Sequence, residues 1–264
     1  YTEFQGAGAG RVSFLLAPHG TYTCTPELLR IVAEKAAERG LGIHIHLSET
    51  VTENQTVISK YQKTPTAILA ETGLLELPLL AAHAVHLTES DQELLLAAGA
   101  GVAHCPASNM KLASGVAPVA DWRQKGLAVG LGTDGAASNN NLDMYEELRL
   151  AGYLQKVITG DPSLVPAGYL LQRAVFGFAG RGLLAPIGRV EPGFQADLQL
   201  VNCAQPHLQP QHSYLSNLVY AAKGSDVDTV LVAGKVVVEN GSLTTIDTEE
   251  LLYEASKRAR KLGG

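Results

Sequence analysis

Between residues 12 and 134 the sequence repeats one rhythm, in which a short apolar segment is followed by a segment of helical character. Near-continuous apolar strands that alternate with helices are typical of a parallel sheet covered by helices. Five such units in about 120 residues is the density of a (β/α) barrel, although a closed barrel has eight strands. We therefore expect an α/β fold that forms part of a (β/α)8 TIM-like barrel. The expected strands are residues 12–17, 42–47, 79–85, 101–105 and 127–134.

Helix signals fall between these strands. Thr25 is a suitable N-cap, Pro26 suits the first helical position, and Gly40 is a suitable terminator. These three residues predict a helix over most of 26–40. Further helices are expected at 88–98, 118–125, 142–158 and 163–180.

The last third of the chain has a different character. Residues 196–201 and 227–241 are β-rich, and the second segment predicts a hairpin that turns near Gly234. A final helix is expected, capped by Asp247 or Thr248, with Gly263 as its stop and a buried stripe of Leu251, Leu252, Ala255 and Ala259. We expect three parts: barrel residues 1–190, a small β domain over 191–245, and a C-terminal helix over 246–264.

Composition excludes several classes of function. The chain is 46% hydrophobic and 17% charged, which is typical of a globular protein. Its formal charge of −6 and the lack of a basic run argue against nucleic acid as a partner. No apolar stretch approaches the roughly 20 residues that a membrane helix needs. The three cysteines are far apart and lack CxxC spacing, so we expect no disulfide framework, no thiolate zinc site, and a reducing, cytoplasmic setting.

Each expected strand ends in a polar residue that could take part in catalysis. The carboxyl ends of barrel strands form one rim, and active sites lie on that rim. Because the chain has eight histidines in all, this placement is improbable by chance. The residues are His19, His46 with Glu49, His83, His104 and Asp134.

Imidazole and carboxylate groups are the ligands of zinc and iron sites, and a bound metal lowers the pKa of a water molecule to about 7. His46 and Asp134 are the best ligand candidates. Glu49 suits a proton shuttle to a substrate, and His83 suits a group that orients or deprotonates the water.

Structural roles compete with these assignments. Glu49 could be a solvated loop carboxylate, Asp134 a helix cap, and His19 a turn residue, while His46 and His83 could serve packing alone. His104 could equally support its neighbours in a turn. We expect His44 to pack beneath His46, where a barrel has layers of packed side chains. The remaining histidines, His86, His207 and His212, have no strand-end context and are expected on the surface or in loops.

Several segments together resemble the amidohydrolase superfamily. APHGTYTC, HIHLSET, AAHAVHLT, AHCPASNMKLASGVAPV and GLGTDGAASNNNLDM occur in this order. They look most like the branch of 5-methylthioadenosine/S-adenosylhomocysteine deaminases and related triazine chlorohydrolases. The tail, from GRVEPGFQADLQLVN onward, is similar to the family segment that completes a β-sandwich beside the barrel.

The resemblance implies a function and roles for the rim residues. His46 would be a metal ligand, and Asp134 both ligand and proton acceptor. Glu49 would hydrogen-bond a purine ring nitrogen and deliver its proton, His83 would hold the attacking water, and His19 would contact the substrate. The implied reaction is hydrolytic deamination of an adenine-containing nucleoside (5-methylthioadenosine, S-adenosylhomocysteine or adenosine), with one Zn²⁺, or Fe²⁺ or Mn²⁺, per complete active site.

One family feature is absent from this sequence. The family's first strand carries an HxH metal pair, and no such strand precedes Tyr1. The resemblance therefore implies that this chain supplies roughly strands 4–8 and needs the N-terminal half of the barrel as a partner. A homo-oligomer is also implied. The alternatives are another amidohydrolase activity, such as that of a guanine deaminase or triazine chlorohydrolase, and a truncated non-catalytic module without the metal pair.

Overall fold

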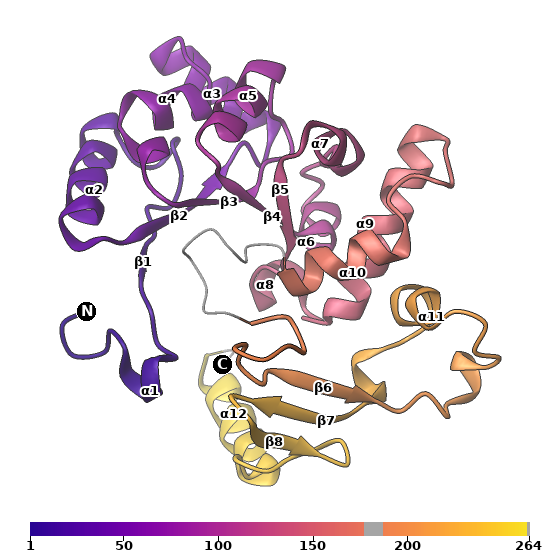
Figure 1. The fold of residues 1–264 in the computed structure, drawn as a ribbon. Coiled ribbons are helices and arrows are strands. Elements are labelled where there is room, and N and C mark those ends of the chain that lie inside the picture. Colours follow the sequence, from indigo (N-terminus) through magenta and orange to yellow (C-terminus); the bar gives the residue numbers. More distant parts are fainter. Residues whose placement is uncertain (177–186, 263–264) are drawn as a thin grey trace.

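The computed structural model describes residues 1–176 and 187–262, which form two β-sheets and their covering helices (Figure 1). The larger sheet is parallel and has the order β1-β2-β3-β4-β5. Its strands are Leu15–Leu16, Gly42–Leu47, Leu79–His83, Gly101–His104 and Ala128–Leu131. The smaller sheet is antiparallel, with the order β6-β7-β8-β9 and the strands Leu198–Val201, Val227–Val232, Lys235–Glu239 and Ser242–Leu243. The expected α/β class, with a parallel sheet and a separate small β unit, is confirmed.

Local capping signals set where the helices begin and end. In α2 (Pro26–Arg39), Thr25 accepts a hydrogen bond from the backbone N–H of Leu28, and Gly40 closes the helix with φ of 63°. The other helices of the first half are α1 (Ala7–Gly10), α3 (Val51–Tyr61), α4 (Pro65–Glu71), η1 (Leu74–Glu76), α5 (Glu89–Ala97), α6 (Pro106–Lys111) and α7 (Val119–Lys125). Those of the second half are α8 (Ala136–Asn139), α9 (Met144–Thr159), α10 (Ala167–Phe176), η2 (Pro206–Leu208), α11 (Tyr214–Tyr220), η3 (Gly224–Asp226) and α12 (Thr248–Leu262).

Two expected elements differ in length from the structure. The strand expected at 12–17 is reduced to Leu15–Leu16, because β1 is at the edge of the sheet and pairs with β2 alone. The helix expected at 163–180 is α10, Ala167–Phe176, and the expected residues beyond 176 lie outside the described part. No helix within the described residues is long and apolar enough to cross a lipid bilayer.

The two faces of the parallel sheet have different environments. Ile43, Ile45 and Leu47 of β2 point toward the helices and are at most 1% exposed, each burial contributing about 1.5–3 kcal/mol. His44 and His46 point to the opposite face, because side chains alternate along a strand. The expectation that His44 packs in a buried layer is wrong for this chain: His44 is exposed, since no described element covers the sheet at that position.

Two hydrophobic clusters hold the elements together. The first fills the space between β2–β5 and their helices and includes the fully buried Trp122 of α7. The second packs Leu148 of α9 and Leu170 of α10 against Val219 of α11. Arg149 strengthens this second contact, since its guanidinium donates to the backbone carbonyls of Tyr220 and Ala222. The segment that follows β6 is therefore attached to the helices that follow β5.

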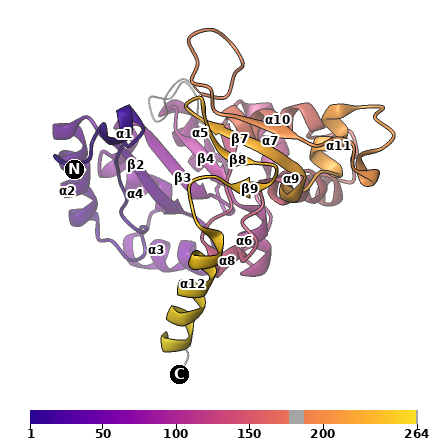
Figure 2. The ribbon, with the colours of Figure 1, turned by 90° about the horizontal axis from the view of Figure 1, so that it is seen from below.

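The C-terminal helix does not bury its apolar stripe. Asp247 caps α12, accepting a hydrogen bond from the N–H of Glu250 at 3.1 Å, as one of the two expected caps. Leu251 is 49% exposed and Leu252 is 62% exposed, so the predicted burial of this stripe is wrong. The physical reason is position: α12 projects away from the rest of the molecule (Figure 2), and none of its residues is buried. The expected stop at Gly263 lies outside the described residues.

Candidate metal and active site

Three strand ends bring His46, His83 and Asp134 together. His46 belongs to β2, His83 ends β3, and Asp134 follows β5. One possible ligand atom from each of these side chains lies within 4.8 Å of the others. The parallel order of the strands explains this convergence, because the carboxyl ends of parallel strands meet at one edge.

Left-handed backbone conformations accompany each of these strand ends. Ser48 after β2 has φ of 47°, His83 and Ala84 at the end of β3 have 70° and 53°, and Asp134 after β5 has 58°. Such values are unfavourable for residues with a Cβ and concentrate at functional sites. They turn the chain sharply at the end of each strand and so fix the direction of the side chains at this edge.

The ring of His46 is oriented by the backbone of the preceding strand segment. Its Nδ1 lies 2.7 Å from the carbonyl oxygen of His19, which can only accept a hydrogen bond. The proton is therefore on Nδ1, and the lone pair of Nε2 is available for a metal ion. The backbone N–H of His46 donates to the same carbonyl at 3.1 Å, so strand pairing and ring orientation share one acceptor.

His83 is held in a similar way by a side-chain amide. Its Nδ1 lies 2.9 Å from Oδ1 of Asn109 on α6, and its ring is 5.6 Å from that of His46, nearly parallel to it. His83 is 1% exposed. Its Nε2 faces Oε2 of Glu49 at 3.9 Å, so the imidazole and the carboxylate approach each other across the site.

Two serine hydroxyls donate to Asp134. Ser108 and Ser138 both bond its Oδ2, at 2.7 Å and 2.5 Å. Burial alone would raise the pKa of Asp134, but the hydrogen bonds from Ser138 and Ser108 outweigh it and lower the pKa. The carboxylate is therefore ionised at neutral pH, as a metal ligand must be.

Glu49 is fixed by its backbone and its side chain. The carboxylate of Glu53 accepts hydrogen bonds from the backbone N–H groups of Ser48 and Glu49, at 3.0 Å and 2.7 Å. Ser114 Oγ donates to Oε1 of Glu49 at 3.1 Å. Burial raises the pKa of Glu53, which is 5% exposed.

His19 stands at the exposed side of the cluster. Its Nδ1 donates to the hydroxyl of Thr23 at 2.8 Å, and that hydroxyl donates onward to the carbonyl of Gly20. The His19 ring lies 4.9 Å from the ring of His46 and 5.5 Å from that of Tyr22. Nε2 of His19 has no hydrogen-bond partner among the described residues, and the exposed ring borders the space beside His46.

The donor set suits a divalent metal ion. Neutral imidazole and carboxylate groups bind zinc, iron and manganese. Nδ1 of His46 already has a hydrogen-bond partner, and the carboxylate of Asp134 is ionised. Both side chains can therefore bind a metal ion without rearrangement. Nε2 of His46 and the carboxylate of Asp134 thus fit the divalent metal ion that the sequence predicts.

A family model for the amidohydrolase family matches residues 2–237. The chain belongs to the amidohydrolase family.

Similar proteins agree with this family assignment. The amidohydrolase chain is 51% identical over 260 residues to a 5-methylthioadenosine/S-adenosylhomocysteine deaminase of Pelotomaculum thermopropionicum, covering 98% of this chain and 60% of that protein. It is 52% identical to the protein of the same name from Moorella thermoacetica, covering 98% of this chain and 61% of that protein. The chain thus spans about 60% of the length of the curated relatives that it matches.

Solved structures show the same fold. An adenosine deaminase from Xanthomonas campestris with bound zinc superposes with a TM-score of 0.92 at 36% identity, over 97% of this chain and 59% of that chain. The atrazine chlorohydrolase of Arthrobacter aurescens complexed with zinc gives a TM-score of 0.84 at 28% identity, over 94% of this chain and 55% of that chain.

The other histidines of this amidohydrolase chain are not part of the group formed by His46, His83 and Asp134. His104 is 0% exposed, and neither of its ring nitrogens has a partner among the described residues. Burial, and secondarily His83, lowers the pKa of His104 to about 3, so it stays neutral. The expectation that His86, His207 and His212 lie on the surface or in loops is confirmed: His86 and His212 are in loops, and His207 is exposed in η2, where it bonds Asp226 at 2.8 Å. The ring of His86 also bonds the carbonyl of Ser114.

Several residues around the cluster were not predicted from the sequence. Asn109, Ser108, Ser138, Ser114 and Glu53 hold His83, Asp134 and Glu49 in place. Only Glu53 has a local signal, because it is at the N3 position of α3, three residues after the cap Thr50. The other contacts, apart from Ser138, join residues 26 or more positions apart.

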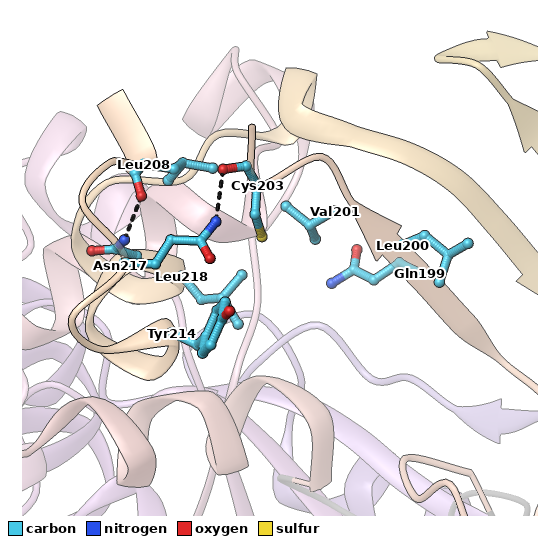
Figure 3. Close-up of a pocket in the computed structure, with 9 residues that line it drawn as sticks. Gln199, Leu200, Val201, Cys203, Leu208, Tyr214, Asn217 and Leu218 are labelled. Carbon is cyan, nitrogen blue, oxygen red and sulfur yellow. Dashed lines mark hydrogen bonds between the residues drawn. The ribbon is translucent and has the colours of Figure 1, made fainter. Parts of the chain in front are cut away.

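A separate hollow of about 260 Å³ lies between β6 and α11 (Figure 3). Its mostly apolar lining includes Leu200, Tyr214 and Leu218. The polar groups beside it are engaged within the chain: Asn217 donates to the carbonyl of Leu208, and Gln211 donates to that of Cys203. None of the cluster residues lines this hollow.

Proposed function

We propose that the whole protein to which this chain belongs catalyses the metal-dependent hydrolytic deamination of an adenine-containing nucleoside, giving the inosine analogue and ammonia. 5-Methylthioadenosine, S-adenosylhomocysteine and adenosine are the proposed substrates. The observation that carries this proposal is the convergence of His46, His83 and Asp134, with Glu49 facing His83. The names of the relatives and the adenosine deaminase fold support it.

His46 and Asp134 are the proposed metal ligands of this chain. Zinc is the proposed ion, with one per complete active site, and Fe²⁺ and Mn²⁺ suit the same donors. The bound metal would lower the pKa of a water molecule so that it is a nucleophile at neutral pH. The zinc in the adenosine deaminase and atrazine chlorohydrolase structures supports the choice of zinc.

The remaining residues hold the substrate or move protons. His83 orients the attacking water through Nε2, because its Nδ1 is committed to Asn109. Asp134 accepts the proton of that water on its carboxylate. Glu49 hydrogen-bonds a ring nitrogen of the purine and delivers a proton there, while His19 contacts the substrate from the exposed side. The bond between C6 and the amino nitrogen then breaks, and the amino group leaves as ammonia with the proton that Asp134 accepted. The proton of the new hydroxyl at position 6 returns to Glu49, which leaves the carbonyl of the inosine analogue.

The proposed assembly extends beyond this chain. We propose that β1–β5 are roughly strands 4–8 of a closed barrel, and that the whole protein supplies the remaining strands, including an HxH metal pair. The exposed inner face at His44 supports this. We also propose that residues 1–190 belong to the barrel, residues 191–245 to the β-sandwich and residues 246–264 to a C-terminal helix. The whole protein is proposed to be a homo-oligomer. The free cysteines Cys24, Cys105 and Cys203 support a reducing, cytoplasmic setting.

The test is ammonia release by the whole protein from 5-methylthioadenosine, S-adenosylhomocysteine and adenosine. Glu49→Gln is expected to lower kcat by about 100-fold or more, in the range of a lost general acid. Glu93→Gln, an exposed carboxylate of α5, is the matched control and should keep wild-type kcat. Turnover of guanine or a triazine without nucleoside deamination would select the alternative amidohydrolase activities. Absence of all turnover, with metal loaded, would favour a non-catalytic module.

A further inference from the structure

The turn that follows α6 reaches across to Glu49. Ser114 in this turn is 5% exposed, and its Oγ donates to Oε1 of Glu49 at 3.1 Å. The backbone N–H of Ser114 donates to the carbonyl of Asn109 at 2.8 Å. Asn109 is also the partner of His83 Nδ1. One short helix and its turn therefore hold the two groups that face each other at 3.9 Å.

His86 fastens this turn from the other side. Its Nε2 lies 2.6 Å from the carbonyl oxygen of Ser114, so Nε2 carries the proton because a carbonyl can only accept. The backbone of His86 is itself anchored: its N–H donates to the carbonyl of Ser48 at 2.9 Å, and its carbonyl accepts from Asn54 Nδ2 at 2.8 Å. The imidazole thus projects from a fixed loop.

Close packing adds to the hydrogen bond. Gly115 has φ of 122°, and a Cβ at this position would lie 3.0 Å from Cγ1 of Val85 and 3.3 Å from Cε1 of His86. Only a residue without a Cβ allows the turn to lie this close to the His86 ring. The turn at residues 112–115 and the His86 ring are therefore complementary in shape as well as in hydrogen bonding.

We propose that Ser114 is a positioning residue that sets the orientation of the Glu49 carboxylate, and that His86 acts as the clamp that holds Ser114 in place. The backbone of Glu49 is fixed through Glu53, but its side chain has Ser114 as its one hydrogen-bond donor among the described residues. Without that donor the carboxylate can rotate away from His83. The catalytic consequence rests on the proposed function, whereas the clamp itself does not.

The first experiment measures catalysis by the whole protein. Ser114→Ala is expected to lower kcat about 10-fold, as the loss of one hydrogen bond to a reacting group does, and to change KM far less. Ser114→Thr retains the hydroxyl and is expected to recover most of the rate. Ser163→Ala removes another hydroxyl that donates to a carboxylate, in an exposed loop, and should leave kcat unchanged. Wild-type kcat in Ser114→Ala would overturn the positioning role.

The second experiment follows backbone hydrogen exchange at residues 112–116. His86→Ala is expected to speed exchange of this segment, and His86→Gln, whose amide can still donate to the Ser114 carbonyl, to slow it again. Ser114→Ala should leave exchange as in the wild type, because the backbone bonds to Asn109 and His86 remain. His212→Ala, at an exposed loop histidine, is the control. Unchanged exchange in His86→Ala would overturn the clamp.

The two experiments separate the possible failures. If the wild-type protein deaminates no nucleoside, the proposed function fails, and the exchange data still decide whether His86 holds the turn. If the wild-type protein is active and Ser114→Ala is equally active, the positioning role alone fails.

Discussion

At the scale of single residues, each imidazole of the cluster has one nitrogen committed to a fixed partner. The carbonyl of His19 takes the Nδ1 proton of His46, and Asn109 takes that of His83. These hydrogen bonds place the proton of each ring on Nδ1, so that the unprotonated Nε2 faces the site. The types of the rim residues were predictable from the sequence, but their partners were not, because Ser114 and Glu49 are 65 positions apart.

Glu147 offers a test of how buried carboxylates support the rim. It is 1% exposed and accepts hydrogen bonds from the N–H of Ala107 in α6 and from Asn139 Nδ2 in α8, joining the helices that follow β4 and β5. Glu147→Gln leaves only one acceptor oxygen for two donors, and should lower the free energy of unfolding by about 1–3 kcal/mol. Urea denaturation measures this, with the exposed Glu34→Gln as control. Equal stability of the two variants would contradict the bridging role.

At the scale of elements, capping residues also connect neighbouring helices. Thr88 and Asp91 form a capping box at the start of α5. Oδ1 of Asp91 accepts a further hydrogen bond, at 2.5 Å, from Thr64, which caps α4. The local box follows from the sequence spacing. The link between the two helix ends arises only when α4 and α5 pack together.

Asp91→Ala is expected to cost more than the loss of an ordinary cap. Asp91 is 1% exposed, and its removal leaves the N–H of Thr88 and the hydroxyl of Thr64 without their acceptor. We expect a loss of about 2–4 kcal/mol in the free energy of unfolding. Glu93→Ala, an exposed acidic residue of the same helix, should change stability by less than about 0.5 kcal/mol in chemical denaturation. A loss as small as that control would mean that the link contributes nothing.

A pH-dependent contact joins η2 to η3. Burial would raise the pKa of Asp226, but the hydrogen bonds from His207 and from the backbone of Lys223 outweigh it and lower the pKa. A lowered folded-state pKa stabilises the protein fully above the unfolded-state value of about 3.9, and this stability is lost as pH falls through the folded-state pKa.

His207→Ala should therefore destabilise the protein by about 1–2 kcal/mol at pH 5 to 6. The difference from the wild type should shrink as the solution is acidified and Asp226 becomes protonated in both proteins. Denaturant unfolding across this range measures it. A difference that is constant down to the acid transition would show that the contact does not act through the Asp226 charge.

At the scale of the whole molecule, the five strands form one curved sheet whose convex side is covered by helices (Figure 1). The concave side carries His44 and His46, and His44 is exposed there. The number of βα units and their order were predictable from hydrophobic periodicity. The exposure of His44 and of α12 was not predictable in this way. Hydrophobic periodicity identifies the apolar face of a strand or helix, but it does not identify which element covers that face.

Metal removal tests the proposed site in the whole protein. A chelator is expected to abolish deamination and added zinc to restore it, with metal content followed by mass spectrometry. Asp134→Asn should lower zinc affinity, because a neutral amide replaces an ionised ligand. The 264-residue chain alone should bind zinc weakly, since only His46 and Asp134 are its proposed ligands and catalytic zinc usually has three. Tight, stoichiometric zinc on this chain would instead assign His83 as a third ligand.

The sequence by itself determined the alternation of strands and helices, the helix caps and the polar residues at the strand ends, because all of these depend on residues close together in the chain. Tertiary structure alone decided which side chains meet. Asn109 reaches His83, Ser108 reaches Asp134, and the turn after α6 reaches Glu49. Such contacts depend on the register of β2–β5 and on left-handed backbone at the strand ends, which packing imposes against local preference.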